Sequence, residues 1–225
     1  MTGENTATWR GYLAAHRKRR DFFKSMGATS ADHGHPTALT CDLGNAECQR
    51  LLDRALSGAI TADEAESFRG QMLTEMAQMS VDDGLVMQIH PGSYRNHNPA
   101  IFREFGRDNG ADIPMRTDYV SVLKSLLDRF GNEAKLTLIL FTLDESTYSR
   151  ELAPLAGHYP ILKAWPAVVV LRQPRGHATI LRTGDRNGGF LQRRRLQRRH
   201  ARVPVHPGPT RCCAPNGFAR TAYKL

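Results

Sequence analysis

The amino-acid sequence predicts an α/β fold with parallel strands covered by helices. Two continuously apolar runs, residues 84–90 and 136–141, have the pattern of buried strands, and residues 24–30 are expected to lead into the first strand. Segments with helical apolar spacing alternate with these runs. This alternation is typical of a (β/α) barrel or a doubly wound sheet. Three strands do not close a barrel, so the chain is predicted to be part of a larger one.

The helices are predicted from apolar spacing and from capping residues. The expected helices span residues 9–24, 45–56, 61–79, 118–130 and 146–156. Thr61 and Glu64 form a capping-box pattern at the start of the third helix. Gly131 is expected to close the fourth.

Length and composition exclude several classes of protein. The chain has 225 residues, 40% of them hydrophobic and 24% charged, which argues against wholesale disorder. It has neither an apolar run long enough to cross a membrane nor the apolar region of a secretory signal near its start. The spacing of Cys41, Cys48, Cys212 and Cys213 fits neither a zinc cluster nor a disulfide framework. A cytoplasmic location is therefore expected.

The positive charge of the chain is confined to its C-terminal part. Residues 171–225 contain 13 basic residues and one acid, whereas the other 170 residues contain 18 basic and 21 acidic residues, a net charge of −3. The Arg-rich run at residues 193–199 is a possible phosphate-binding segment, but it lacks interleaved aromatic residues. Nucleic-acid binding is therefore the weaker interpretation of the net charge of +9.

Polar clusters follow the predicted strands, where α/β enzymes place their chemistry. Asp32, His33 and His35 supply a carboxylate and two imidazoles, which suit acid–base work or metal binding, or else form a polar loop before a helix. His90 ends an apolar strand, and Arg95 and Asn98 follow it. An arginine there suits a carboxylate ligand. The alternative is a loop whose His and Asn satisfy backbone groups.

Asp144 follows the third predicted strand and is ambiguous. It is either a catalytic carboxylate or the start of the next helix, where acidic residues are favoured.

Several long motifs resemble the uronate isomerase (glucuronate isomerase) family of the amidohydrolase superfamily. They are Phe22-Phe23-Lys24, Ala31-Asp32-His33-Gly34, Met87 to Asn98, Gly110 to Pro114, Leu140 to Glu145 and Tyr148 to Gly157. They occur in the family's order and lie within residues 8–163.

The resemblance implies a fold, an activity and a set of site residues. The fold would be an α/β partial (β/α)8 TIM-type barrel of the amidohydrolase kind in residues 1–163. The activity would be interconversion of D-glucuronate with D-fructuronate and of D-galacturonate with D-tagaturonate. Asp32 and His90 would be catalytic, and His33, Arg95 and Asn98 would bind substrate. The family carries one divalent metal, usually taken as zinc, and an oligomeric state is left open.

The sequence also departs from the family's pattern. The family is about twice as long, and its metal-binding His-x-His pair would lie upstream of Met1, so His33-Gly34-His35 is not that pair. No metal ligand is therefore assigned to this chain. The likeness stops after Lys163, and residues 164–225 are predicted to be an irregular, Arg- and Pro-rich tail.

A shifted reading frame accounts for the tail. With suitable synonymous codons, residues 168–178 reread one base later give Trp-Trp-Phe-Phe-Asp-Ser-Pro-Glu-Gly-Met, a family motif, and two later stretches also give family motifs in order. We therefore expect a frameshift near Ala164 and little or no activity in this fragment. Three alternatives stay open: a half-enzyme that complements a separate N-terminal part, a related sugar-acid hydrolase, and a nucleic-acid-binding protein.

Overall fold

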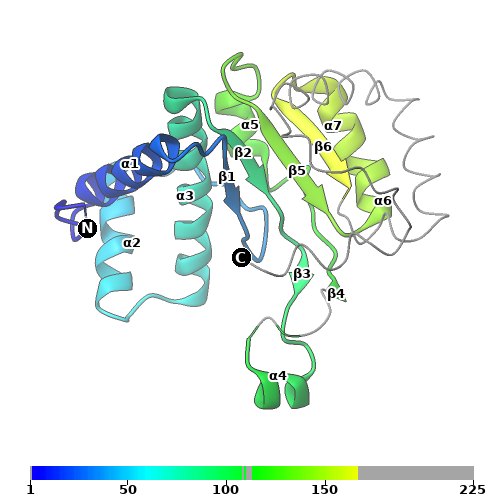
Figure 1. The fold of residues 1–225 in the computed structure, drawn as a ribbon, viewed down its shortest axis with the longest axis horizontal. Coiled ribbons are helices and arrows are strands. Elements are labelled where there is room, and N and C mark those ends of the chain that lie inside the picture. Colours follow the sequence, from blue (N-terminus) through cyan, green and yellow to red (C-terminus); the bar gives the residue numbers. More distant parts are fainter. Residues whose placement is uncertain (1, 108, 110–112, 167–225) are drawn as a thin grey trace, which may run out of the picture. The chain divides into compact units, whose positions relative to one another are not determined.

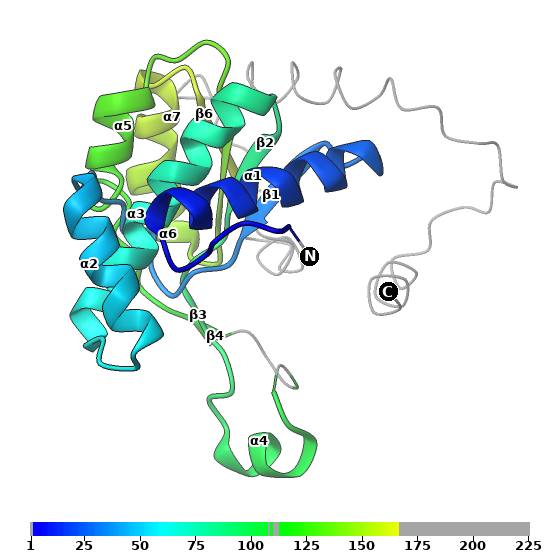
Figure 2. The same ribbon diagram turned by 90° about the vertical axis from the view of Figure 1, so that its left-hand side faces the viewer.

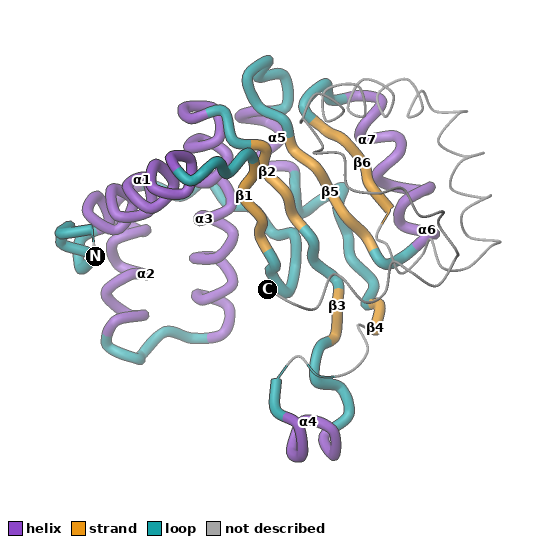
Figure 3. Tube along the Cα trace, viewed as in Figure 1, coloured by secondary structure: helices purple, strands orange, loops and turns teal. Residues whose placement is uncertain are grey.

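The computed structural model describes residues 2–107, 109 and 113–166 (Figure 1). Its centre is a four-stranded sheet of β1 (Ser30–His33), β2 (Val86–Ile89), β5 (Leu138–Thr142) and β6 (Leu162–Pro166). The order is β1-β2-β5-β6, and all neighbouring strands are parallel (Figure 3). The predicted α/β class with a parallel sheet is confirmed.

Helices connect the strands and cover the sheet. They are α1 (Trp9–Ser25), α2 (Asn45–Leu56), α3 (Ala62–Asp83), α5 (Lys124–Phe130), α6 (Glu145–Thr147), a π-helical turn (Tyr148–Leu152) and α7 (Ala153–His158). Figure 2 shows α3, α5 and α7 on the same side of the sheet. Within the described residues, no helix is long and apolar enough to cross a membrane.

The core forms where alternate strand residues meet the helices. Met87 and Ile89 of β2 are fully buried and pair in register with Leu138 and Leu140 of β5. Because side chains alternate along a strand, all four face the same way, and they share one hydrophobic cluster with Leu73 of α3. The sheet is therefore fixed to its helices by continuous apolar packing.

The predicted helix caps are present. Thr61 Oγ1 accepts the backbone N–H of Glu64 at 3.3 Å, and Glu64 Oε2 accepts the backbone N–H of Thr61 at 3.0 Å. Gly131 is the C-cap of α5. The capping residues thus mark these helix ends as the sequence predicts.

Three predicted elements have different bounds, and one of them is the helix expected over residues 146–156, which is divided into α6, the π-helical turn and α7. Residues 24–30 lead into the first strand, as expected: α1 runs to Ser25, Gly27 turns the chain with φ of +94°, and β1 begins at Ser30. Asp32 therefore lies inside the first strand rather than after it. The helix predicted from residue 118 begins at Lys124, because the Asp118 carboxylate accepts the backbone N–H of Ser121 at 3.1 Å and holds a turn there.

The sequence does not predict four further elements. β6 is a fourth parallel strand, paired with β5 through Leu138 and Leu162. The strands β3 (Ser93–Tyr94) and β4 (Ile113–Pro114) form an antiparallel ribbon that carries α4 (Pro99–Phe105). Figures 1 and 2 show this excursion projecting from the strand-end edge of the sheet. The predicted tail lies outside the described residues apart from residues 164–166.

Candidate active site

Asp32 and His90 meet at the carboxyl edge of the sheet. Asp32 belongs to β1, and His90 directly follows the neighbouring strand β2. The backbone N–H of His90 donates to the carbonyl of His33 at 3.1 Å, which extends the pairing of the strands. The side chains then come together, with 2.9 Å between His90 Nε2 and Asp32 Oδ2. Their side chains are 34% and 55% exposed, so the pair is open to a ligand.

Gly34 makes room for the His90 ring. A Cβ atom at Gly34 would lie 2.6 Å from Cε1 and 3.1 Å from Nε2 of His90. Contacts below 3.0 Å are essentially never made by real Cβ atoms. The imidazole therefore rests against a bare backbone, and the glycine after His33 is required for the contact with Asp32.

His33 lies on the other face of β1 from Asp32, because successive strand residues point to opposite faces. Burial is the main cause that lowers its pKa to about 4, and the charges of His35 and of Arg20 in α1 add to the effect. Its Nε2 is buried and has no hydrogen-bond partner in the described structure. His33 is therefore a neutral imidazole behind the pair rather than a third member of it.

The histidines near the pair do not form a metal centre. The ring centroids of His33 and His35 are 6.3 Å apart. Burial and the charge of Arg69 lower the pKa of His35, while Glu66 acts in the opposite direction. Across residues 2–107, 109 and 113–166, no group of three or more His, Cys, Asp or Glu side chains is placed to hold a metal ion. The donors present here do not fit the divalent metal that the family implies.

Arg95 and Asn98 lie on the excursion that follows β2. Arg95 is exposed just after β3. Asn98 is the N-cap of α4, and its Oδ1 accepts the backbone N–H groups of Ala100 and Ile101 at 3.0 and 3.4 Å. The amide oxygen of Asn98 thus has a structural role, as one of the two interpretations of the sequence expected.

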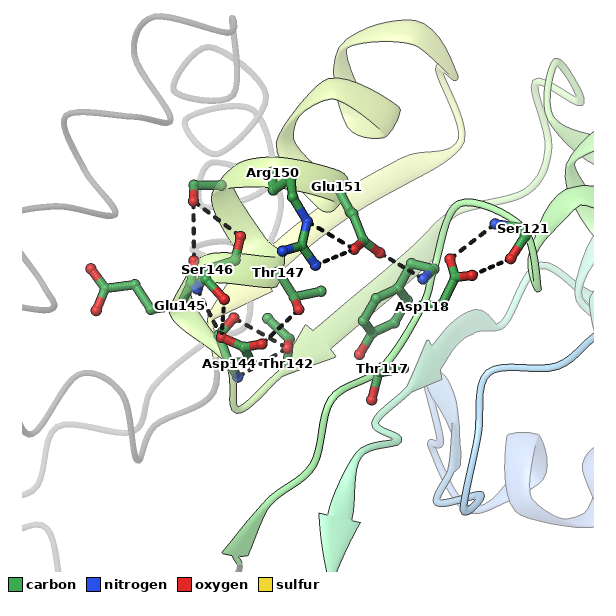
Figure 4. Close-up of polar contacts among 12 residues, drawn as sticks. Thr117, Asp118, Ser121, Thr142, Asp144, Glu145, Ser146, Thr147, Arg150 and Glu151 are labelled. Carbon is green, nitrogen blue, oxygen red and sulfur yellow. Dashed lines mark hydrogen bonds and ion pairs between the residues drawn. The ribbon is translucent and has the colours of Figure 1, made fainter.

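Asp144 caps the helix that follows β5. Its carboxylate accepts the backbone N–H of Ser146 at 2.9 Å and the hydroxyls of Ser146 and Thr147 at 2.7 Å each (Figure 4). Although burial opposes it, this set of hydrogen bonds lowers the pKa of Asp144. The geometry matches the structural interpretation of this residue.

Known proteins match most of the chain. The sequence profile of the glucuronate isomerase family matches residues 1–164. The uronate isomerase of Xanthomonas axonopodis pv. citri (strain 306) is 66% identical over 167 residues, covering 74% of this chain and 35% of the relative. That of Brucella suis biovar 1 (strain 1330) is 60% identical over 183 residues, covering 81% of this chain and 39% of the relative.

Solved structures agree with the sequence matches. The crystal structure of glucuronate isomerase from Caulobacter crescentus has a TM-score of 0.80 and 56% identity over 84% of this chain and 40% of that one. The uronate isomerase of Thermotoga maritima has a TM-score of 0.71 and 26% identity over 78% of this chain and 39% of that one. The chain thus spans 35% to 40% of the length of these relatives. The parallel sheet of the described residues accordingly corresponds to part of their barrel, and the chain belongs to the glucuronate isomerase family.

Proposed function

We propose that this chain carries part of the active site of a uronate isomerase, an aldose–ketose isomerase of hexuronates. The substrates would be D-glucuronate, converted to D-fructuronate, and D-galacturonate, converted to D-tagaturonate. The observation that carries the proposal is the 2.9 Å contact between Asp32 and His90 at the carboxyl edge of a parallel sheet. High identity to uronate isomerases over this same region supports it.

The reaction needs the kind of groups that the pair provides. Isomerisation moves a proton from C2 to C1 of the sugar and another between the two oxygens, which requires a base and an acid. With Asp32 ionised, Nε2–H of His90 donates the hydrogen bond, and the carboxylate is the proton acceptor. A proton can pass between Asp32 and His90 without movement of the backbone. One of the two groups can therefore take a proton from the sugar while the other gives one back to it.

The remaining proposed residues support this pair. The backbone carbonyl of His33 accepts the backbone N–H of His90, and this hydrogen bond fixes the position of His90 along the carboxyl edge of the sheet. Arg95 supplies an exposed cation for an acidic sugar on the loop after His90, and Asn98 holds the start of the helix that this loop enters. Both are proposed to contact or orient the substrate.

The isolated chain is expected to show little or no isomerisation. The family's divalent metal would polarise the sugar carbonyl, and the described residues offer no set of ligands for it. The test is conversion of D-glucuronate by purified chain with added zinc or manganese. No conversion above the protein-free rate is expected. Turnover at a rate typical of the family would contradict this part of the proposal.

A half-enzyme arrangement gives the matching positive test. The chain is co-expressed with the parts of the Caulobacter crescentus enzyme that it does not cover. Conversion that appears only in the combination and disappears with Asp32→Asn supports catalysis by the pair. Conversion that survives Asp32→Asn would contradict it. A substrate screen that includes sugar-acid esters separates an isomerase from a hydrolase.

The C-terminal part is proposed to be translated out of frame from about Ala164. The family profile ends its match at residue 164, which supports a boundary there. Resequencing the coding DNA for residues 162–171 tests it: a missing or additional base is expected, and a confirmed frame would contradict the proposal. The Arg-rich run lies outside the described residues, and the relatives found do not favour nucleic-acid binding.

A further inference from the structure

Gln88 is a polar residue within an otherwise apolar strand. It lies in β2 between Met87 and Ile89, which are fully buried. β2 is paired on both sides, with β1 and with β5 (Figure 3). Strands in the middle of a parallel sheet have continuous apolar runs, because both of their faces are covered in a complete fold. The amide of Gln88 therefore needs a polar partner.

Gln88 lies on the same face of the sheet as the Asp32–His90 pair. Side chains alternate along a strand, so Gln88 points away from the helices that Met87 and Ile89 contact. Asp32 is the register partner of Gln88 across the β1–β2 ladder, and register partners share a face. His90 follows Gln88 by two residues and reaches Asp32. The three polar side chains are therefore neighbours on one face.

The other neighbours of Gln88 on this face are apolar. Along β2, Val86 precedes it by two residues, a spacing of about 6.6 Å. Across the ladder, Ile139 of β5 is its register partner, and adjacent strands are about 4.8 Å apart. Neither Val86 nor Ile139 has a side chain that can pair with an amide. The polar partner of Gln88 must therefore lie beside Asp32 and His90.

The amide of Gln88 makes no hydrogen bond with the residues that the structure describes, and Asp32 and His90 pair with each other instead. In that part of the chain, the fully buried side-chain atoms without a partner belong to Trp9 and His33. The amide of Gln88 is therefore accessible from outside. An unpaired amide gives no stability that an apolar side chain of the same shape would lack. Its donor and its acceptor are free for a ligand at the pair.

The chemistry of an amide restricts what it can do for a hexuronate. A neutral amide does not exchange protons at this pH, so it binds rather than catalyses. The oxygens on C1 and C2 take part in the proton transfers proposed for Asp32 and His90. The next oxygen along the sugar is the C3 hydroxyl. D-Glucuronate and D-galacturonate have the same configuration at C3 and differ at C4, so one amide at C3 suits both.

We propose that Gln88 binds the C3 hydroxyl of the hexuronate whose C1 and C2 lie at Asp32 and His90. Resting on the proposed function, this assignment adds a residue that recognises the uncharged part of the sugar. The amide donates to the hydroxyl oxygen or accepts the hydroxyl proton. A site built around such a contact discriminates against a sugar without the hydroxyl, because the amide is then left unpaired.

The test measures binding by calorimetry in the chain combined with the parts of the Caulobacter crescentus enzyme that it does not cover. The ligands are D-glucuronate and its 3-deoxy analogue. Gln88→Met keeps the length of the side chain and removes the amide. It is expected to weaken binding of D-glucuronate roughly tenfold, and binding of the 3-deoxy analogue by less than about threefold.

Gln78→Met is the matched control. Gln78 lies on α3, and its Nε2 donates to Asp82 Oδ1 at 3.0 Å in an exposed contact. This variant is expected to leave both affinities unchanged. Thermal unfolding of the full chain gives a second measurement: Gln88→Met should be at least as stable as Gln78→Met, because it removes no hydrogen bond within the described residues.

Four results would overturn this inference. They are unchanged affinity for D-glucuronate in Gln88→Met, an equal loss for both ligands, a loss of stability in Gln88→Met that exceeds that in Gln78→Met, and no binding of D-glucuronate by the unsubstituted combination. Failure of the proposed reaction is a separate outcome. The combination would then bind D-glucuronate, with the selective loss in Gln88→Met, yet convert none.

Discussion

His90 lies against the backbone of Gly34, with space for a hydrogen atom but not for a methyl group. A Cβ there would be 2.6 Å from Cε1 of the imidazole. The same imidazole reaches Asp32 at 2.9 Å through Nε2. The position of the His90 ring in the proposed acid–base pair therefore depends on Gly34, a residue without a side chain that follows the neighbouring strand β1.

Gly34→Ala is expected to separate Asp32 from His90. The added methyl group must displace the ring, because overpacking of this kind forces side chains out of position and costs roughly 1–3 kcal/mol. Histidine-selective NMR should show the His90 ring signals shifted and no longer sensitive to Asp32→Asn. Gly44→Ala is the control, since a Cβ at Gly44 meets nothing within 4 Å. Unchanged His90 signals in Gly34→Ala would refute the packing argument.

His33 is expected to make stability depend on pH in weakly acidic solution. Its pKa in the folded protein is about 4, against 6.5 for a free histidine, so the unfolded chain binds more protons between these values. The stability contributed is complete above pH 6.5 and is lost as pH falls toward 4. The difference in pKa corresponds to on the order of 3 kcal/mol. Urea unfolding from pH 4 to 7 measures it.

A substitution isolates that contribution. His33→Gln should flatten the stability curve between pH 4 and 6.5, while the exposed His97→Gln should leave its slope unchanged. An unchanged slope in His33→Gln would show that other groups carry the pH dependence.

The buried ion pair between α1 and α3 is expected to be important for stability. Arg20 Nε and Nη2 donate to the Asp83 carboxylate at 2.6 and 3.0 Å, and both side chains are mostly buried. Asp83→Asn removes a buried charge partner and should cost roughly 3–5 kcal/mol in thermal or urea unfolding. Asp82→Asn next to it removes an exposed pair with Arg17 and should cost less than about 1 kcal/mol. Equal losses would contradict the role of burial.

Asp83 also sets an acid limit to stability. Burial opposes ionisation, but the hydrogen bonds from Arg20 and from the backbone N–H of Leu85 lower its pKa below 3.8. Because the folded-state pKa is depressed, the stability it contributes is present above pH 3.8 and is lost as pH falls further. The acid limb of the unfolding curve should therefore be shallower in Asp83→Asn.

Local signals predicted the parts of the fold that depend on local interactions. The capping box of Thr61 and Glu64 and the helical spacing of α2 are properties of short segments, and the structure has both. The neighbourhood of Asp32 and His90 was also predictable, because carboxyl ends of parallel strands share an edge. The sequence pattern and the strand topology both place these two residues at the carboxyl edge of the sheet.

Tertiary contacts determined what the sequence left unassigned. β6 contains Lys163 and Pro166, so it lacks the apolar run of a buried strand and forms because β5 offers it an edge.

The central claim is that Asp32 and His90 transfer the proton at C2 of a hexuronate. Loss of the C2–H signal of D-glucuronate in D2O, followed by proton NMR, measures this step directly. The chain combined with the parts of the Caulobacter crescentus enzyme that it does not cover is predicted to exchange this hydrogen, and Asp32→Asn and His90→Asn are predicted to stop the exchange. Exchange that continues at the same rate in both variants would contradict the account.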